Sequence, residues 1–452
     1  MVPISPLDGR YGERLAALGA YFSEPALVGA RVRVELRYLR LLHARGLFPP
    51  LSSAEQARFQ DALEDFQDAD LARVKAIEAV TRHDVKAVEI FLREKLQLQR
   101  PQAIHFGLTS EDVSNLAWSS LFRGYLHDHQ LPLLDRLLAR LADLAERWRD
   151  VPFPSHTHGQ PASPTTAGKE LAVFAGRLLR LRRQLAGFRF LGKLAGATGN
   201  YSAMVAAFPE HDWVDLAQTL AAELGLDHNP LTTQVEDHDT WARWFDLTRG
   251  LNNVIIDLNR DLWAYISRDL YRQRKAPGQV GSSTMPHKVN PINFENSEGN
   301  LELSNALLTL LSDKLCRSRM QRDLSDSTVQ RNVGVAMGHA HLAWLECLRG
   351  LDRIELDPAA CARTLEAHPE LLGEPIQTIL KVEGVPDPYE LLREHTQGQA
   401  VTHASLMAMV AGLDISAGAR ARIQALTVGG YVGLAPQLAD RIIAAVREEI
   451  AP

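Results

Sequence analysis

The segment GSSTMPHKVNP, residues 281–291, places two serines, a histidine and a lysine among glycine and proline residues that favour turns. A serine can remove a proton only where N–H groups, a cation or a helix end stabilise its alkoxide. Ser282 is therefore a candidate general base, and Lys288 is a candidate partner for the anion. The alternatives are a serine that caps a turn and a lysine that is exposed to solvent.

A second polar segment, SHTHGQPASPTTAGKE at residues 155–170, carries the pair His156 and His158. A histidine titrates near neutral pH, so it can donate a proton to a leaving group. No Asp, Glu or Cys accompanies the pair at a recognisable ligand spacing, which leaves a zinc hydrolase as a distant alternative. Either histidine is therefore a candidate acid, although a solvated loop histidine is the common alternative.

A third polar segment, HFGLTSEDVSN at residues 105–115, predicts the start of a helix, with Thr109 or Ser110 as N-cap and Asp112 in the capping-box position. The second segment contains Ser163-Pro164 and the first ends in Asn290-Pro291, and we interpret each pair as N-cap and first helical residue. Helix N-termini offer unpaired N–H donors and partial positive charge. If the three ends converge, they form a site for carboxylates or phosphate, whereas each alone is explained by ordinary capping.

The segment CRSRMQRDLSDSTVQRN, residues 316–332, concentrates arginines and hydroxyl side chains. Arginine and hydroxyl groups form charge-assisted hydrogen bonds to phosphate oxygens. The segment is therefore a candidate phosphate site, and a solvated charged face is the alternative.

Apolar residues at alternating steps of three and four predict the long helices that carry these segments. Such seams run through residues 134–148, 171–188 and 244–265, and strict two-residue alternation is scarce. Helices of this length need partners to cover their seams, which favours a helix bundle. We predict an all-α protein with an elongated central helix bundle.

Length and composition agree with several helical domains in one soluble chain. We expect an N-terminal helical domain at residues 1–108, the central bundle at 109–356 and a C-terminal helical domain at 357–452. The formal net charge of −6 argues against a general nucleic-acid binder. Three cysteines match no metal-ligand or CxxC spacing, and no segment is typical of a secretory signal or a bilayer span. We therefore expect a cytoplasmic protein that binds neither nucleic acid nor membrane.

These segments together resemble the signatures of a known superfamily. GSSTMPHKVNP matches the GSSxMPxKxNP loop of the fumarase/aspartase superfamily, and THGQPA (157–162) and TSEDVSN (109–115) resemble its other two signature regions, in the same order. DGRYGE, TRHDVKAVE, TTQVEDHD and RDLSDSTVQRN are most similar to the adenylosuccinate lyase family within it. The resemblance spans nearly the whole chain. It implies the fumarase/aspartase fold and a β-elimination of fumarate from adenylosuccinate and from succinylaminoimidazole carboxamide ribotide (SAICAR), without metal or organic cofactor.

The resemblance also implies roles for individual residues. Ser282 matches the base that removes the proton from the succinyl β-carbon, and His158 matches the acid that protonates the leaving nitrogen. The position of His156 varies within the family, so we leave His156 out of the site. Glu295 matches the carboxylate that orients this histidine, and Lys288 matches a group that holds the anion. Residues matched to the succinyl half and its surroundings are Thr109, Ser110, Gln234, Ser283, Val289, Asn290 and Asn296. Residues matched to the same pocket, with Arg82 in place of the asparagine of some members, are Arg82, His83 and Asp84. Residues matched to the phosphate and its surroundings are Arg10, Tyr11, Arg322, Ser327, Thr328 and Arg331.

The resemblance further implies a homotetramer whose active sites are shared between subunits. Two alternatives stay open at this point. Another lyase of the superfamily would act on argininosuccinate, aspartate or malate, which have no phosphate for the arginine-rich segment to hold. A catalytically inert structural protein on this fold would not need Ser282, His158, Lys288 and Glu295 together.

Overall fold

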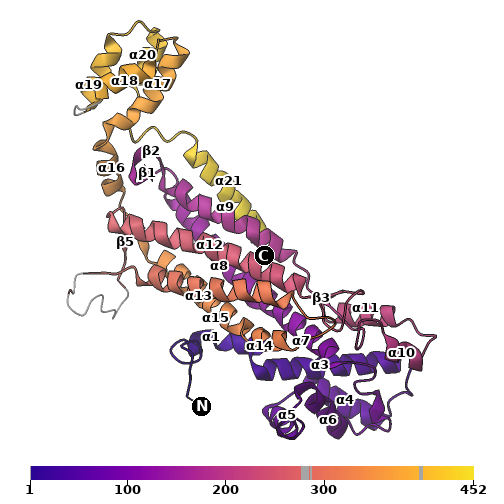
Figure 1. The fold of residues 1–452 in the computed structure, drawn as a ribbon. Helices are drawn as coiled ribbons and strands as arrows, with labels where there is room; N and C mark the ends of the chain where they lie inside the picture. Colours follow the sequence, from indigo (N-terminus) through magenta and orange to yellow (C-terminus); the bar gives the residue numbers. More distant parts are fainter. Residues whose placement is uncertain (1, 276–284, 286–287, 397–400, 452) are drawn as a thin grey trace. The chain divides into compact units, whose positions relative to one another are not determined.

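The computed structural model describes residues 2–275, 285, 288–396 and 401–451 (Figure 1). Long helices dominate it, because the predicted seams place apolar side chains on one face. Leu134, Leu141, Leu178 and Leu251 are all fully buried. The prediction of an all-α fold is confirmed.

The helices follow in chain order. The first group is α1 (Gly12–Leu15), α2 (Gly19–Phe22), α3 (Glu24–Ala44), α4 (Ser53–Glu64), α5 (Asp68–Thr81), α6 (Asp84–Leu96), α7 (Ser110–Tyr125) and α8 (Leu131–Arg147). The second group is α9 (Ala167–Ala186), α10 (Ser202–Ala207), α11 (Trp213–Glu223), α12 (Asp239–Ser267), α13 (Ile292–Leu315), α14 (Ser325–Gln330) and α15 (Val333–Leu351). The last group is α16 (Pro358–Glu366), α17 (Gly373–Val382), α18 (Pro388–Thr396), α19 (His403–Ala411), α20 (Ala417–Gln424) and α21 (Ala435–Glu449).

The described strands form three small two-stranded sheets. β1 (Pro152–Thr157) pairs antiparallel with β2 (Gln160–Thr166), and β5 (Tyr271–Gln273) pairs antiparallel with β6 (Ile354–Leu356). β3 (Leu191–Gly192) pairs in parallel with β4 (Asp227–His228).

The hairpin β1–β2 corrects one expectation about a helix start. The Ser163-Pro164 pair is not an N-cap, because both residues lie within β2. Pairing of Phe153 with Thr165 keeps the backbone extended until the strand ends, and α9 begins only at Ala167. The Thr166 hydroxyl accepts the hydrogen bond from Lys169 N at 3.2 Å and so caps the helix instead.

Contacts divide the chain into two compact units. Unit 1 contains Met1–Leu133, Leu181–Asn253 and Gly299–Trp344. Unit 2 contains Leu134–Arg180, Val254–Glu298 and Leu345–Pro452. The predicted division into three domains remains a prediction.

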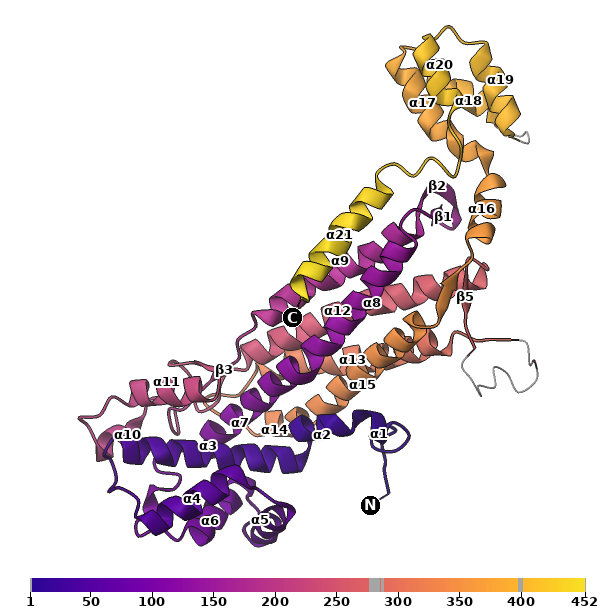
Figure 2. The ribbon, with the colours of Figure 1, turned by 180° about the vertical axis from the view of Figure 1, so that it is seen from behind.

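Each unit has its own apolar core. In unit 1, side chains of α3 to α6 form a buried cluster around Leu36, Val88 and Phe91. In unit 2, α16 to α20 and the segment between α20 and α21 enclose a second cluster around Leu380. Figure 2 shows the last helix, α21, beside α9 within unit 2, where Arg447 forms an ion pair with Glu146 of α8. No described helix is both long enough and apolar enough to cross a bilayer.

Candidate active site

A cavity of about 840 Å³ in unit 1 gathers many of the predicted substrate-binding residues. Its wall combines the turn before α6, the start of α7, a loop before α12 and the region of α14. The predicted residues that line it are Arg82, His83, Asp84, Thr109, Ser110, Gln234, Arg322, Ser327, Thr328 and Arg331.

The start of α7 forms one wall of this cavity, with Thr109 as its N-cap, as predicted. Asp112 Oδ2 accepts hydrogen bonds from Thr109 N at 2.8 Å and Thr109 Oγ1 at 3.0 Å. His83 caps α6 by accepting from Lys86 N at 3.1 Å, so its other ring nitrogen, Nε2, can donate toward Ser110 Oγ at 3.4 Å. Two helix N-termini therefore meet at the cavity, which favours an anionic ligand.

Arg31 holds Asp84, the next residue on the wall. Its Nη1 donates to Asp84 Oδ2 at 2.8 Å, and its Nη2 donates to Ser114 Oγ at 3.2 Å. Burial would raise the pKa of Asp84, but the charge and hydrogen bond of Arg31 lower it below its usual value. Sequence reasoning missed Arg31, although two charged residues four positions apart, Arg31 and Glu35, on the otherwise apolar buried face of α3 were a usable signal.

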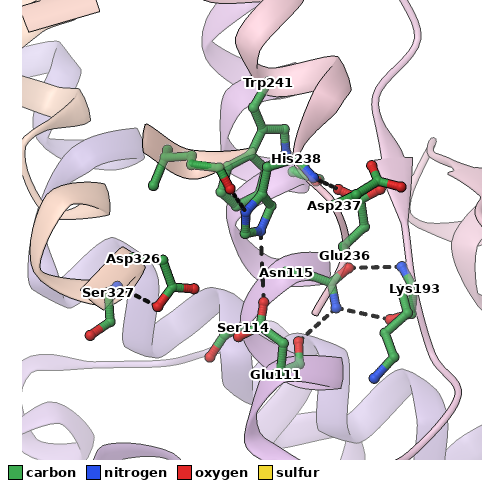
Figure 3. Close-up of polar contacts among 12 residues, drawn as sticks. Glu111, Ser114, Asn115, Lys193, Glu236, Asp237, His238, Trp241, Asp326 and Ser327 are labelled. Carbon is green, nitrogen blue, oxygen red and sulfur yellow. Dashed lines mark hydrogen bonds and ion pairs between the residues drawn. The ribbon is translucent and has the colours of Figure 1, made fainter. Parts of the chain in front are cut away.

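Arg322 forms ion pairs with two buried carboxylates, Glu111 and Asp326, which are both labelled in Figure 3. Arg322 Nη1 lies 3.0 Å from Glu111 Oε2 and 3.1 Å from Asp326 Oδ2. Glu111 Oε1 also lies 3.7 Å from Nε2 of His238, whose ring stacks on Trp241 with 4.0 Å between centroids. Two carboxylates therefore already balance the charge of Arg322, which the sequence did not indicate.

The buried histidine of this network is charged more easily than an ordinary histidine. Burial would lower the pKa of His238, but the hydrogen bond and charge of Glu111 raise it above its usual value. Burial raises the pKa of neighbouring Glu236 to about 7.

Arg82 and Arg331 differ from Arg322 in their lack of a carboxylate partner among the described residues. Among the residues that the structure describes, no carboxylate forms an ion pair with either of them. Arg82 also has a left-handed backbone, with φ of 54°, where it ends α5. These two guanidinium groups give the cavity positive charge that a ligand can balance.

The described residues among the predicted catalytic ones, His158, Lys288 and Glu295, belong to unit 2. His158 is exposed at the turn between β1 and β2, with φ of 53°. Glu295 lies on the first turn of α13, where its Oε1 accepts a hydrogen bond from Trp263 Nε1 at 3.1 Å. Lys288 is exposed just before α13, and Val289, Asn290 and Asn296 are half-buried on either side of the helix start.

The remaining predicted residues lie elsewhere. Ser282 and Ser283 are outside the described residues. Arg10 and Tyr11 precede α1 and are not part of the cavity wall, and the guanidinium of Arg10 lies 5.8 Å from the centre of the Tyr11 ring. Within the described ranges, no group of three or more His, Cys, Asp or Glu side chains is placed to hold a metal ion.

Comparisons with known proteins find lyases along nearly the whole chain. The family model described as lyase matches residues 34–303, and the model of the adenylosuccinate lyase C-terminal region matches residues 318–432. The adenylosuccinate lyase of Escherichia coli K12 is 43% identical over 450 residues, covering 98% of this chain and 99% of the relative. The adenylosuccinate lyase of Haemophilus influenzae shows the same identity and coverage.

Solved structures show the same fold at lower sequence identity. The 3-carboxy-cis,cis-muconate lactonizing enzyme of Pseudomonas putida has a TM-score of 0.78 at 22% identity, covering 96% of this chain and 98% of that one. The fumarate lyase of Mesorhizobium sp. BNC1 has a TM-score of 0.78 at 17% identity, with coverage of 95% and 97%. At these identities the similarity bears on the fold alone.

Proposed function

The chain belongs to the adenylosuccinate lyases of the fumarase/aspartase superfamily, and from this premise we propose how its residues share the reaction. The protein is a lyase with adenylosuccinate lyase function in purine biosynthesis. The observation that carries the assignment of residues is the cavity of unit 1, which is lined by two helix N-termini and by two guanidinium groups that pair with no carboxylate among the described residues. Such a wall suits a substrate with both carboxylates and a phosphate.

The chemical step is an elimination that needs one base and one acid. Ser282, as its alkoxide, takes the proton from the succinyl β-carbon, and the resulting carbanion delocalises into the adjacent carboxylate. The carbon–nitrogen bond then breaks, the carbon–carbon double bond of fumarate forms, and His158 protonates the departing nitrogen. Glu295 orients His158, and Lys288 stabilises the negative charge.

Different residues of the cavity bind different parts of the substrate. Thr109 and Ser110, at the N-terminus of α7, hold the succinyl half together with Gln234. Arg331 and Ser327 hold the phosphate, with Arg82 adding positive charge. Arg322 contributes donors but little net charge, because Glu111 and Asp326 already balance it.

The same site cleaves SAICAR, since this nucleotide carries the same succinyl group and phosphate. Both substrates are small molecules of nucleotide synthesis, so the enzyme acts in the cytoplasm. Its three cysteines are free, as expected for a reducing compartment.

The enzyme works as a homotetramer in which one site combines residues from several chains. Exposed apolar side chains on α13 support this assembly. Leu303 and Leu310, seven residues apart on one helix face, are 54% and 53% exposed, and a partner helix would cover them. Residues of unit 2 such as His158 would then serve a cavity of another subunit.

Turnover of adenylosuccinate by the purified protein tests this function. Absorbance should report AMP and fumarate, and Ser282→Ala should lower the rate by at least ~10²–10⁴-fold. Activity on argininosuccinate without activity on adenylosuccinate would overturn the assignment.

A further inference from the structure

Lys193 is a fully buried lysine directly after β3, with 0% of its side chain exposed. Its Nζ lies 2.8 Å from Asp112 Oδ1, 2.7 Å from Gln234 O and 2.9 Å from Gly196 O. A lysine ammonium has three protons, so these three oxygens use all of its donors. A buried ammonium is tolerated only when it is paired in this way.

The carboxylate of Asp112 extends this arrangement to the start of α7. Asp112 Oδ1 also accepts from Ala195 N at 2.8 Å and Gly196 N at 3.2 Å. Its Oδ2 accepts from the backbone N–H and the hydroxyl of Thr109. One carboxylate therefore connects the loop after β3 with the N-cap residue on the cavity wall.

Asn115 adds a second connection one turn further along α7 (Figure 3). Its Oδ1 accepts from Lys193 N at 2.8 Å, and its Nδ2 donates to Lys193 O at 2.9 Å. The backbone of Lys193 is thus fixed to α7 independently of its side chain, so that loss of the ammonium would not by itself detach the strand.

The Lys193 ammonium also fixes the backbone of Gln234, a second residue that lines the cavity. The Lys193 ammonium donates to the backbone carbonyl of Gln234, and the side-chain Nε2 of Gln234 donates to Ala197 O at 2.9 Å. The two loops are in close contact, because a Cβ on Gly199 would lie 2.0 Å from Thr232 O. Thr109 and Gln234, which both line the cavity, therefore have their positions set through one buried cation.

We propose that Lys193 is a positioning residue that sets Thr109 and Gln234 in place for the succinyl half of the substrate without touching it. This rests on the proposed function, in which those two residues contact the succinyl half. The alternative is an ion pair that only stabilises the fold. The ion pair of Lys95 with Asp70, at 2.9 Å, offers a matched control, since neither residue lines the cavity.

Steady-state kinetics of Lys193→Met against Lys95→Met separate these roles. We expect Lys193→Met to raise KM for adenylosuccinate roughly 10–100-fold with a much smaller change in kcat. Inhibition by fumarate should weaken by a similar factor, while inhibition by AMP should be unchanged. Lys95→Met should lower the melting temperature and leave KM unchanged. A wild-type KM in folded Lys193→Met overturns the proposal.

Amide hydrogen exchange tests the same inference without the reaction. The amides of Thr109, Ala195 and Gly196 should exchange faster in Lys193→Met than in Lys95→Met, because Asp112 loses its cation. If the wild-type protein does not cleave adenylosuccinate, the proposed function fails, and exchange still decides the role of the ammonium. If Lys193→Met does not fold, Lys193→Arg takes its place, since it keeps the charge but cannot reach the three oxygens in the same geometry. If neither variant folds, Lys193 is purely structural and the proposal is wrong.

Discussion

Trp263 Nε1 lies 3.1 Å from Glu295 Oε1, so the indole of α12 donates a hydrogen bond to the carboxylate on the first turn of α13. Both side chains reach solvent, and Trp263 is 47% exposed. One oxygen of Glu295 is thereby fixed, and its other oxygen can accept a hydrogen bond from a different partner. In the proposed mechanism that partner is His158 of a neighbouring subunit.

Trp263→Phe should therefore lower kcat more than it changes KM. A hydrogen bond to a charged group contributes about 1.5–3 kcal/mol, so loss of orientation should cost roughly tenfold in kcat. Steady-state kinetics check this, with Trp213→Phe as control, since Trp213 Nε1 donates at 3.1 Å to the backbone carbonyl of Phe208 and not to a candidate catalytic residue. An unchanged kcat would separate Glu295 from the protonation step.

Arg331→Ala should raise KM through loss of a phosphate contact. The expected increase is about 10–100-fold, from a charge-assisted hydrogen bond of about 1.5–3 kcal/mol. Arg319→Ala is a suitable control, because the Arg319 side chain is 83% exposed and lies outside the cavity wall. A dephosphorylated substrate should be handled equally by wild type and Arg331→Ala. Equal damage with both substrates would mean that Arg331 is structural.

The ion pair of His105 and Glu35, with 2.5 Å between Nδ1 and Oε1, should make stability depend on pH. Burial would lower the pKa of His105, but Glu35, with smaller contributions from Glu89 and Asp112, raises it above 6.5. A raised folded-state pKa gives stability that is full below pH 6.5 and is lost as pH rises through the folded value.

Thermal unfolding between pH 6 and pH 9 measures this effect. The melting temperature of the wild-type protein should fall over that range, and Glu35→Gln should reduce the slope. Glu24→Gln, which removes the exposed partner of Lys75, should keep the wild-type slope. A slope that Glu35→Gln does not alter would assign the pH dependence to other groups.

Mixed assemblies of Ser282→Ala and His158→Ala should regain part of the activity that each variant lacks alone. Some sites of a mixed tetramer would draw an intact serine from one chain and an intact histidine from another. The two proteins are unfolded and refolded together, and co-purification through a tag on one of them confirms that mixed tetramers form. Mixed tetramers without activity would refute shared sites, as would a monomer in sedimentation at micromolar concentration.

Local patterns in the sequence were sufficient to predict the long helices and the positions of some helix ends. The seam through Leu178 and the capping box of Thr109 and Asp112 depend on neighbours three or four residues away, which the sequence displays directly. The prediction that Ser163-Pro164 starts a helix was wrong because it also used only neighbouring residues. Strand pairing decides that segment, because the next residues, Thr165 and Thr166, pair with Phe153 and Pro152, which stand more than ten residues away.

The sequence by itself determined the fold class, the family and the residue types that the chemistry needs, because periodicity and signature segments are properties of short stretches. Only the tertiary structure decided which charges are available to a ligand. Arg322 and Arg331 look equivalent in the sequence, yet Glu111 of a distant helix balances Arg322 and no described carboxylate pairs with Arg331. Asp112 and Gln234, two of the three partners of the Lys193 ammonium, are likewise separated from it by tens of residues. Buried charges need partners wherever packing brings the chain together, and no local pattern specifies that place.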